Sequence, residues 1–431
     1  MPQPVFPDPP ADARLGSGGP PPREAFQLSM LVTDQRYRGL LLQTLVFILV
    51  MTLGWWLIHN AVVNLAALGK PFDMSFLFRR AGYDIPQQLF PYTADDTHLR
   101  ATIVGLLNTL QVAVLGCIAA TILGVLIGVA RLSRNWLLAR LMTIYVEMFR
   151  NIPVLLWIYV AFAVLVEIAP APADYRGENP AARMLFFDTV APTNRYLAVP
   201  RVVLENPPGI WHLGREGISF ATLSFIAVIA LALVVRHFLR AWAQRQQDAT
   251  GRRPVVWWIS LAVWLVPTVL LLWHYQARLE VPELAGFNFK GGAKLDNAFV
   301  ALWAALTLYT AAFIAEIVRS GILAVSKGQS EAAFALGIAP GLTMRKVVLP
   351  QALRVIVPPL ISQYLNLTKN SSLAIAVGFM DLRGTLGGTT LNQTGRELEA
   401  MALMMSIYLV LSLIISGAMN LFNARVRLKE R

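Results

Sequence analysis

Long apolar runs alternate along the chain with polar or basic segments, which is the pattern of a protein that crosses a membrane several times. A spanning helix needs about 20 mostly apolar residues. We predict spans at 40–58, 101–130, 154–169, 220–235, 255–273, 298–324, 353–377 and 401–422. The expected fold class is therefore an all-α polytopic membrane protein with about eight transmembrane helices.

The apolar stretch 136–169 needs a separate interpretation. As one helix it would be about 50 Å long, which exceeds a hydrocarbon core of about 30 Å. It contains Pro153, which breaks helices. We predict an interfacial elbow up to about Met148, a break at 151–153 and a span from Val154. Glu147, Arg150 and Asn151 are expected to organise the broken elbow.

Composition supports the membrane assignment. Hydrophobic residues make up 56% of the 431 residues and charged residues only 14%, whereas soluble domains carry about 25% charged residues. The net charge of +12 would suggest nucleic acid in a soluble protein. With the N-terminus inside, however, the cytoplasmic segments hold 19 basic and 7 acidic residues, against 14 and 15 outside. This asymmetry predicts that both termini are cytoplasmic and that nucleic acid is not a partner.

Several kinds of chemistry are disfavoured. The single cysteine, Cys117, excludes an internal disulfide framework and a cysteine-based metal cluster. The five histidines are scattered, with no pair at metal-ligand spacing on one helix. No G-x-x-x-x-G-K-[ST] motif is present, so the chain has no P-loop for ATP. We expect no metal, no cofactor and no catalytic residues, which argues against an intramembrane enzyme.

The segment 326–352 carries a spaced motif, E-A-A-x3-G-x9-I-x-L-P, with one conservative change. Its residues are Glu331, Ala332, Ala333, Gly337, Val347 in place of Ile, Leu349 and Pro350. Gly337 permits a turn after a short helix over 331–336. A second short helix over 343–348 is expected to stop before Pro350. Two such helices would form a compact knob whose small residues allow a partner to dock closely.

This motif resembles the EAA loop of the inner-membrane permease subunits of ABC importers, where the loop docks on the ATPase. Other runs resemble the polar amino acid branch of that family. They are GLLNTL at 105–110, YVEMFRNIP at 145–153, YTAAFIAEIVRSG at 309–321, GQ at 328–329, LPQALR at 349–354 and KNSSL at 369–373. The resemblance covers 101–169 and 297–422, and it implies a five-helix type I permease core.

The rest of the chain looks like the long form found in the larger permease of broad-specificity L-amino acid importers of Gram-negative bacteria. The expected organisation is a disordered cytoplasmic tail at 1–38, a leading transmembrane helix and periplasmic loop at 39–100, and the first core part at 101–169. An insertion with a periplasmic loop and two extra transmembrane helices follows at 170–296, then the second core part at 297–422 and a cytoplasmic tail at 423–431. The role of the loop at 170–218 is left open.

The resemblance also implies partners and a location. An ABC ATPase dimer would bind the EAA loop, and a second permease subunit would complete a heterodimer. A periplasmic amino acid-binding protein would deliver the amino acid substrate. The protein would lie among the lipids of the bacterial inner membrane as a multi-pass subunit, without its own ATPase site.

Polar residues within spans are costly and usually face partners or a water-filled path. Tyr309, Glu316 and Arg319 follow one stripe of a predicted helix. They are candidates for the substrate path, because a zwitterionic amino acid needs both an anionic and a cationic or hydroxyl partner. The alternative for Glu316 and Arg319 is an internal salt bridge, and Arg319 could also snorkel to the interface.

A second polar stripe interrupts the following span. Asn366, Lys369 and Ser372 are its candidate path residues. Polar groups in hydrocarbon must find partners, so this face should meet protein or water rather than lipid. Family members usually have Lys-Asp-Thr-Ser where this chain has Lys-Asn-Ser-Ser at 369–372, so Lys369 lacks the neighbouring counter-ion.

We therefore predict the permease subunit of an ATP-driven ABC importer for L-amino acids, with broad or polar specificity. The main rival is an ion-coupled secondary amino acid transporter working through Glu316 and Lys369. That rival leaves the EAA spacing unexplained. A passive membrane scaffold is disfavoured by the polar faces on two spans.

Overall fold

The computed structural model describes residues 35–426 apart from 178, 214–215 and 253. These residues fall into two compact units, 1–73 and 74–431, which are described separately. In the first unit, α2 (Gln35–Ala67) exposes apolar side chains along most of its length, as expected for a span that faces lipid. The tail predicted at 1–38 lies outside the described residues up to position 34, and so do the last five residues of the chain.

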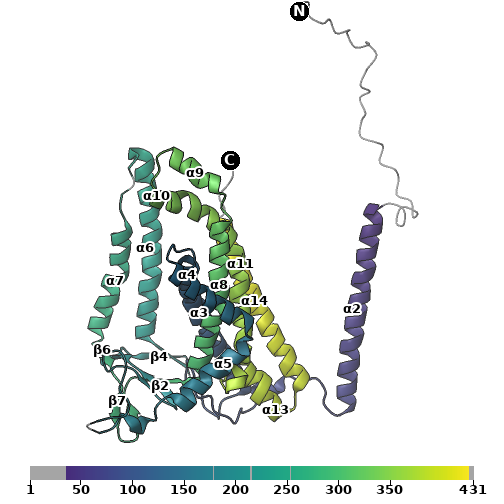
Figure 1. Cartoon of the computed structure of the whole chain (residues 1–431). Coiled ribbons are helices and arrows are strands. Elements are labelled where there is room, and N and C mark those ends of the chain that lie inside the picture. The colour runs from purple at the N-terminus through teal and green to yellow at the C-terminus, as the bar shows by residue number, and fades with distance from the viewer. Residues whose placement is uncertain (1–34, 178, 214–215, 253, 427–431) are drawn as a thin grey trace, which may run out of the picture. The chain divides into compact units, whose positions relative to one another are not determined.

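The second unit is a bundle of long helices (Figure 1). They are α3 (His98–Ala130), α4 (Trp136–Asn151), α5 (Val154–Ala163) with its π-helical extension η2 (Val164–Ile168), α6 (Phe220–Thr250), α7 (Trp257–His274), α8 (Asn297–Leu323), α11 (Leu349–Asn370) with the 3-10 segment η5 (Ser371–Val377), and α14 (Glu397–Val426). Within the described residues, six helices including α2 are long and apolar enough to span a membrane, and the bent pair α4–α5 makes a seventh. The more polar α11 corresponds to the span predicted at 353–377. The predicted fold class is confirmed.

The core of the bundle is built around α8, which packs against α3, α4, α5 and α11. Two glycines of α3 let it approach α8 closely. A Cβ atom on Gly124 would lie 2.6 Å from Cβ of Ile314, and one on Gly128 would lie 2.7 Å from the carbonyl oxygen of Ala315. The small-residue spacing on α3 therefore serves packing within the chain.

The predicted break at 151–153 is present, and α4 and α5 meet there at 105°. The elbow helix continues to Asn151, three residues beyond the predicted end. The Asn151 amide donates a hydrogen bond to the Glu147 carboxylate over 3.3 Å. Arg150 instead reaches across to α8 and forms an ion pair with Glu316 at 3.7 Å. The elbow is therefore tied to the core by a side chain as well as by its apolar face.

The segment between the spans predicted at 220–235 and 255–273 is largely helical. The Arg/Gln-rich segment at 236–254 continues α6 to Thr250, and Gly251 ends the helix in the left-handed conformation with φ of +69°. Arginine, glutamine and alanine all favour helices, so the helix continues where hydrophobicity falls. Gly251 accepts the positive φ without the steric cost of a side chain.

Both polar segments around α6 and α7 form β-structure, which the hydrophobic pattern did not predict. A three-stranded sheet contains β1 (Ala191–Pro192), β2 (Tyr196–Val199) and β9 (Ala293–Asp296). Three antiparallel pairs join β3 (Arg201–Leu204) to β6 (Ala277–Glu280), β4 (Ile210–Leu213) to β5 (Glu216–Ser219), and β7 (Glu283–Ala285) to β8 (Asn288–Lys290). We call these nine strands and their connecting loops the β platform.

The β platform forms because α6 and α7 make an antiparallel hairpin. The hairpin returns the chain to the end of the bundle at which α6 begins (Figure 1). Segments about 80–100 residues apart in sequence then pair, as in the register Leu197↔Leu295 and Val202↔Leu279. Strand β9 runs directly into α8, whose first turn is capped by the Asp296 side chain. The platform is therefore joined without a linker to the central helix.

Candidate functional site

The motif loop forms two short helices between α8 and α11, at one end of the bundle (Figure 1). They are α9 (Lys327–Ala335) and α10 (Pro340–Thr343). The predicted turn lies between them, with Gly337 at φ of +72°. The amide of Ile338 donates to the carbonyl of Ala333 over 3.0 Å, and that of Gly337 to the carbonyl of Phe334 over 2.9 Å. This hydrogen-bond pattern ends α9 and requires a left-handed residue at position 337.

The loop presents apolar side chains to its surroundings. Ala333 is buried and anchors α9, whereas Glu331, Ala332, Gly337 and Leu349 are exposed. The motif residues Val347 and Pro350 are half-buried. Large apolar side chains are exposed beside the motif: Phe334, Leu336, Leu342 and Met344. A cluster of exposed apolar side chains on a polar loop is typical of a protein–protein contact.

The helix predicted to stop before Pro350 instead continues, and that prediction is wrong. A π-helical turn, η4 (Met344–Val348), joins α10 to α11 without a break. The amide of Leu349 donates to the carbonyl of Met344 in the wider π pattern. Pro350 has no N–H and would clash in a regular turn, and it is accommodated at the first turn of α11 directly after this widening.

An ion cluster gathers on the face of α8 that meets α3 and α4. The Glu316 carboxylate pairs with Arg131, which directly follows α3, and with Arg319 at 3.3 Å and Arg150 at 3.7 Å. The Arg131 side chain is 6% exposed, so this pair is largely removed from solvent. The Glu316–Arg319 salt bridge considered from the sequence is present. Arg131 was missed because its partner lies 185 residues further along the chain.

Aromatic packing continues this cluster. The rings of Tyr309 and Phe313 lie 5.0 Å apart, and the Arg150 guanidinium lies 5.4 Å from the centre of the Phe313 ring. Tyr309 also packs against a small core that includes Phe149 of the elbow. The predicted stripe of Tyr309, Glu316 and Arg319 is therefore occupied by contacts within the chain.

The second polar stripe lies on an open face of α11. Asn366 and Lys369 are exposed, and the half-buried Ser372 donates its hydroxyl hydrogen bond to the Lys369 carbonyl over 2.7 Å. Among the described residues no carboxylate forms an ion pair with Lys369. The opposite face of α11 is held by Leu367, which packs near Gly116, and by a 2.8 Å hydrogen bond between the hydroxyls of Thr121 and Tyr364. Within the described chain, no hydrogen bond or ion pair links this stripe to the Glu316 cluster.

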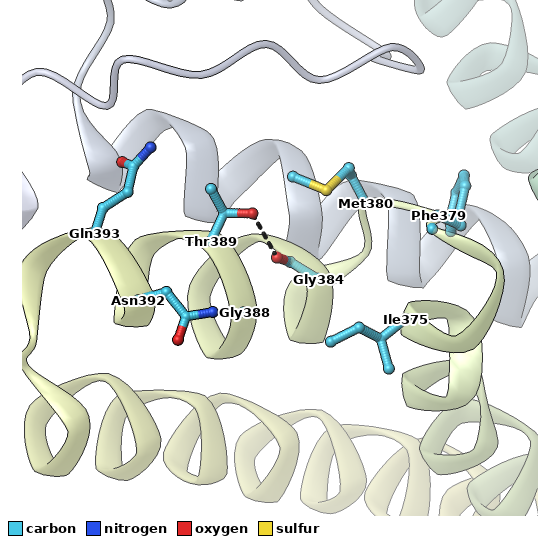
Figure 2. A pocket seen from close by; sticks show the side chains of 9 residues that line it. Ile375, Phe379, Met380, Gly384, Gly388, Thr389, Asn392 and Gln393 are labelled. Carbon is cyan, nitrogen blue, oxygen red and sulfur yellow. Dashed lines mark hydrogen bonds between the residues drawn. The ribbon is translucent and has the colours of Figure 1, made fainter.

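A hollow of about 440 Å³ lies between η5 and the segment before α14 (Figure 2). This segment contains α12 (Leu382–Gly384), η6 (Thr385–Thr390) and α13 (Leu391–Thr394). The lining includes Phe379 and Met380 on one side, and Thr389, Asn392 and Gln393 on the other. Its polar groups are uncharged hydroxyls and amides. Pockets of 300–1,000 Å³ commonly hold small molecules, and the hydrophobic pattern gave no indication of this one.

A buried carboxylate supports the same segment. Asp381 is fully buried, accepts a 2.8 Å hydrogen bond from the Gly384 amide and a 3.3 Å hydrogen bond from the Tyr408 hydroxyl. Burial raises the pKa of Asp381 to about 7, although these hydrogen bonds oppose the shift. The neighbouring amide of Leu382 donates to the Thr109 hydroxyl over 3.0 Å. Asp381, which the sequence interpretation passed over, thus ties the segment that lines the hollow to α14, and the Leu382 amide ties it to α3.

Residues 253–428 match the family described as "Binding-protein-dependent transport system inner membrane component". The glutamate/glutamine/aspartate/asparagine transport system permease protein BztB of Rhodobacter capsulatus is 56% identical over 420 residues, which cover 95% of this chain and 99% of BztB. The general L-amino acid transport system permease protein AapQ of Rhizobium johnstonii is 44% identical, over 92% of this chain and 94% of AapQ.

The Escherichia coli protein YhdX, a putative amino-acid ABC transporter permease, is 42% identical over 95% of this chain and 99% of its own length. A crystal structure of an amino acid ABC transporter with histidines has 19% sequence identity and a TM-score of 0.42, and the match covers 76% of this chain and 95% of that chain. The similarity to BztB, AapQ and YhdX includes the long insertion as well as the helices around the motif loop.

Proposed function

This chain belongs to the inner membrane permeases of binding-protein-dependent amino acid ABC transporters, and we propose that it supplies one half of an importer's pathway. An ATPase dimer would bind the loop of α9 and α10, and ATP hydrolysis would be the partner's activity. The observation that carries this proposal is the exposed apolar loop placed directly between α8 and α11, the two helices that bear the polar stripes.

The geometry of the loop suits mechanical coupling. Helix α10 continues through η4 into α11, so a displacement of the loop would displace α11. A 3.1 Å hydrogen bond from the Gln351 amide to the Gln329 side chain ties α9 to the same helix. ATP binding needs only to favour one loop position in order to favour one orientation of the pathway.

The open stripe on α11 supports a second permease subunit. Exposed Asn366 and Lys369 would be costly against lipid, so in the membrane they require protein or water beside them. A second, similar permease in a heterodimer would cover this face and enclose a polar path along Asn366, Lys369 and Ser372. Tyr309, Glu316 and Arg319 would border the path at the end nearer the motif loop.

The substrates we propose are acidic and amide amino acids. BztB, whose name gives glutamate, glutamine, aspartate and asparagine, is 56% identical to this chain. A Lys369 ammonium without a counter-ion in the described chain would attract the carboxylate of a passing substrate.

The charge asymmetry between the predicted cytoplasmic and periplasmic segments supports cytoplasmic termini. This orientation would place the motif loop inside and the β platform in the periplasm.

Uptake by the complete transporter in proteoliposomes tests the proposal. We expect uptake of labelled glutamate and glutamine that requires ATP in the ATPase compartment and a soluble binding protein on the other side. Uptake driven by an ion gradient without ATP would instead support a secondary transporter.

Lys369→Gln should weaken glutamate uptake roughly tenfold relative to glutamine uptake, which is the loss expected for one charge-assisted contact. Lys369→Arg, which keeps the charge, is the control, and equal effects on both substrates would remove Lys369 from the path.

A further inference from the structure

Two phenylalanines project from a tight loop at 185–190 that directly precedes β1 of the β platform. Phe186 is 74% exposed and Phe187 is fully exposed. Together with Asp188 they form three consecutive residues in the left-handed region, with φ of +51°, +59° and +60°. Positive φ is uncommon for any residue with a side chain and unfavourable for bulky ones. The chain therefore accepts a backbone cost that turns these rings away from the platform.

Hydrogen bonds hold the loop in this shape. The amide of Leu185 donates to the carbonyl of Val190 over 2.7 Å, and the amide of Val190 donates back to the carbonyl of Leu185 over 3.1 Å. Inside this closure, the Thr189 hydroxyl donates to the carbonyl of Phe186 over 2.7 Å. The two rings are presented by a closed loop, which lowers the entropy cost of binding a partner.

Phe186 and Phe187 are not packed into the small apolar core that lies next to them in sequence. Phe289 is fully buried in that core with Ala191 and Ala198, and Met184 and Leu284 pack against it. Phe186 follows Met184 by two residues. Phe287, which follows Leu284 by three residues, is 81% exposed beneath the Arg176 guanidinium, 4.6 Å from its ring centre. Three exposed aromatic residues thus lie within three positions of residues that pack in this one core.

The position of the β platform at one end of α8 indicates the side of the membrane on which it lies. Strand β9 leads directly into α8, and the Asn297 amide at the start of α8 donates to the platform carbonyl of Thr193 over 2.9 Å. The far end of α8 leads into α9 of the motif loop (Figure 1). The platform therefore lies at the opposite end of the central helix from the proposed ATPase contact.

We propose that Phe186, Phe187 and Phe287 form the docking site for the transporter's soluble amino acid-binding protein. This inference rests on the import function proposed above. A family described as binding-protein-dependent requires a soluble partner, and this partner must approach on the side opposite the ATPase. Aromatic residues are enriched where protein interfaces gain most of their affinity.

Two ion pairs link strands of the β platform and its loops. Arg201 of β3 pairs with Glu280 of β6 at 2.9 Å, and Arg278 pairs with Glu205 at 2.6 Å. These cross-strand pairs neutralise four charges on β3, β6 and the loop that follows β3. The fold of the platform, in which β2 and β9 are hydrogen-bonded neighbours, would connect a docked protein to the first turn of α8.

The first experiment places a photo-crosslinking amino acid at position 186 or 187 of the full chain in cells that express the complete transporter. The expected adduct is a soluble protein which, once purified, binds free amino acids and stimulates the transporter's ATPase. Adducts confined to lipid or to the second permease, or the absence of an adduct, would overturn the docking proposal.

The second experiment measures ATPase stimulation by that binding protein in nanodiscs. The double variant Phe186→Asn, Phe187→Asn keeps residues that tolerate the left-handed region. It should raise the half-saturating concentration of the binding protein at least about tenfold and leave basal ATPase activity unchanged. Phe238→Ser, which alters an equally apolar and 67% exposed residue on α6, is the control and should have no effect.

The outcomes separate the two proposals. A wild-type complex without binding-protein-stimulated uptake would refute the proposed function itself. Normal stimulation of both the wild type and the double variant would leave the import function standing and overturn the docking site alone.

Discussion

The Glu316 carboxylate of α8 forms an ion pair with Arg131, the residue that directly follows α3. Because the Arg131 side chain is only 6% exposed, its charge has little access to water and depends on this partner. The pair joins the two halves of the core, which are separated in the sequence by the whole insertion. Glu316 was a candidate for the substrate path, and its contacts show that it also holds helices together.

Glu316→Gln should destabilise the folded permease by about 3 kcal/mol, because it leaves the Arg131 guanidinium buried without a counter-ion. Thermal unfolding in detergent would measure the loss. Arg319→Gln is the matched control: Arg319 is 37% exposed and its pairing should contribute less than about 1 kcal/mol. Adding Arg131→Met to Glu316→Gln should recover part of the stability. A double variant less stable than Glu316→Gln would contradict the assigned pairing.

Gly337→Ala should weaken the association with the ATPase through backbone conformation alone. No atom lies within 4 Å of an added Cβ, so the change brings no clash, but φ of +72° costs a residue with Cβ about 1 kcal/mol. Gly337→Asn should be milder because asparagine tolerates this region. Gly341→Ala also meets open space, without a positive φ, and serves as control. The amount of ATPase that co-purifies with each variant would rank the three substitutions by their effect on the association. Equal amounts of ATPase with Gly337→Ala and Gly341→Ala would exclude a role for the turn.

Gly124→Ala should separate α3 from α8. The new methyl group would sit 2.6 Å from Cβ of Ile314 and 2.9 Å from the carbonyl of Ala311, so one helix must move, at a cost of roughly 1–3 kcal/mol. Gly417→Ala on α14 meets nothing within 4 Å and should leave the unfolding temperature unchanged. Similar unfolding temperatures for both variants would show that the two helices are less tightly packed than described.

Asp381 should make the stability of the protein depend on pH. Its pKa is raised by burial from 3.8 to about 7, so between these values the folded protein keeps a proton that the unfolded chain releases. Stability should therefore fall as pH rises through this window, by up to roughly 1.4 kcal/mol per pH unit, and level off above pH 7. Unfolding temperatures between pH 5 and 8 would show the slope.

Asp381→Asn should flatten that slope while keeping an oxygen that accepts from the Gly384 amide. Asp95→Asn is the control, since the Asp95 side chain is 78% exposed and pairs with the exposed Arg80 at 2.5 Å. A slope that survives in the Asp381→Asn variant would assign the pH dependence to another group.

Local patterns in the sequence were enough to predict the spans, the break before Pro153 and the turn at Gly337. Each depends on neighbouring residues: a run of apolar side chains, a missing N–H, or a backbone without Cβ. The same local reasoning failed at Pro350, because a π-helical turn absorbs the clash that should have ended the helix. The same reasoning also ended the span that corresponds to α6 at 235, whereas the helix continues to Thr250, because hydrophobicity falls from position 236 but helix propensity does not.

The sequence by itself determined that this chain is a multi-pass membrane permease and where its motif loop lies, because hydrophobic length and motif spacing are properties of contiguous residues. Only the tertiary structure decided that Glu316 meets Arg131, that Asp381 is buried, and that the segments around β2 and β9 pair. Those contacts join residues far apart along the chain, and they arise only after the helices pack and return the polar segments to the same end of the bundle.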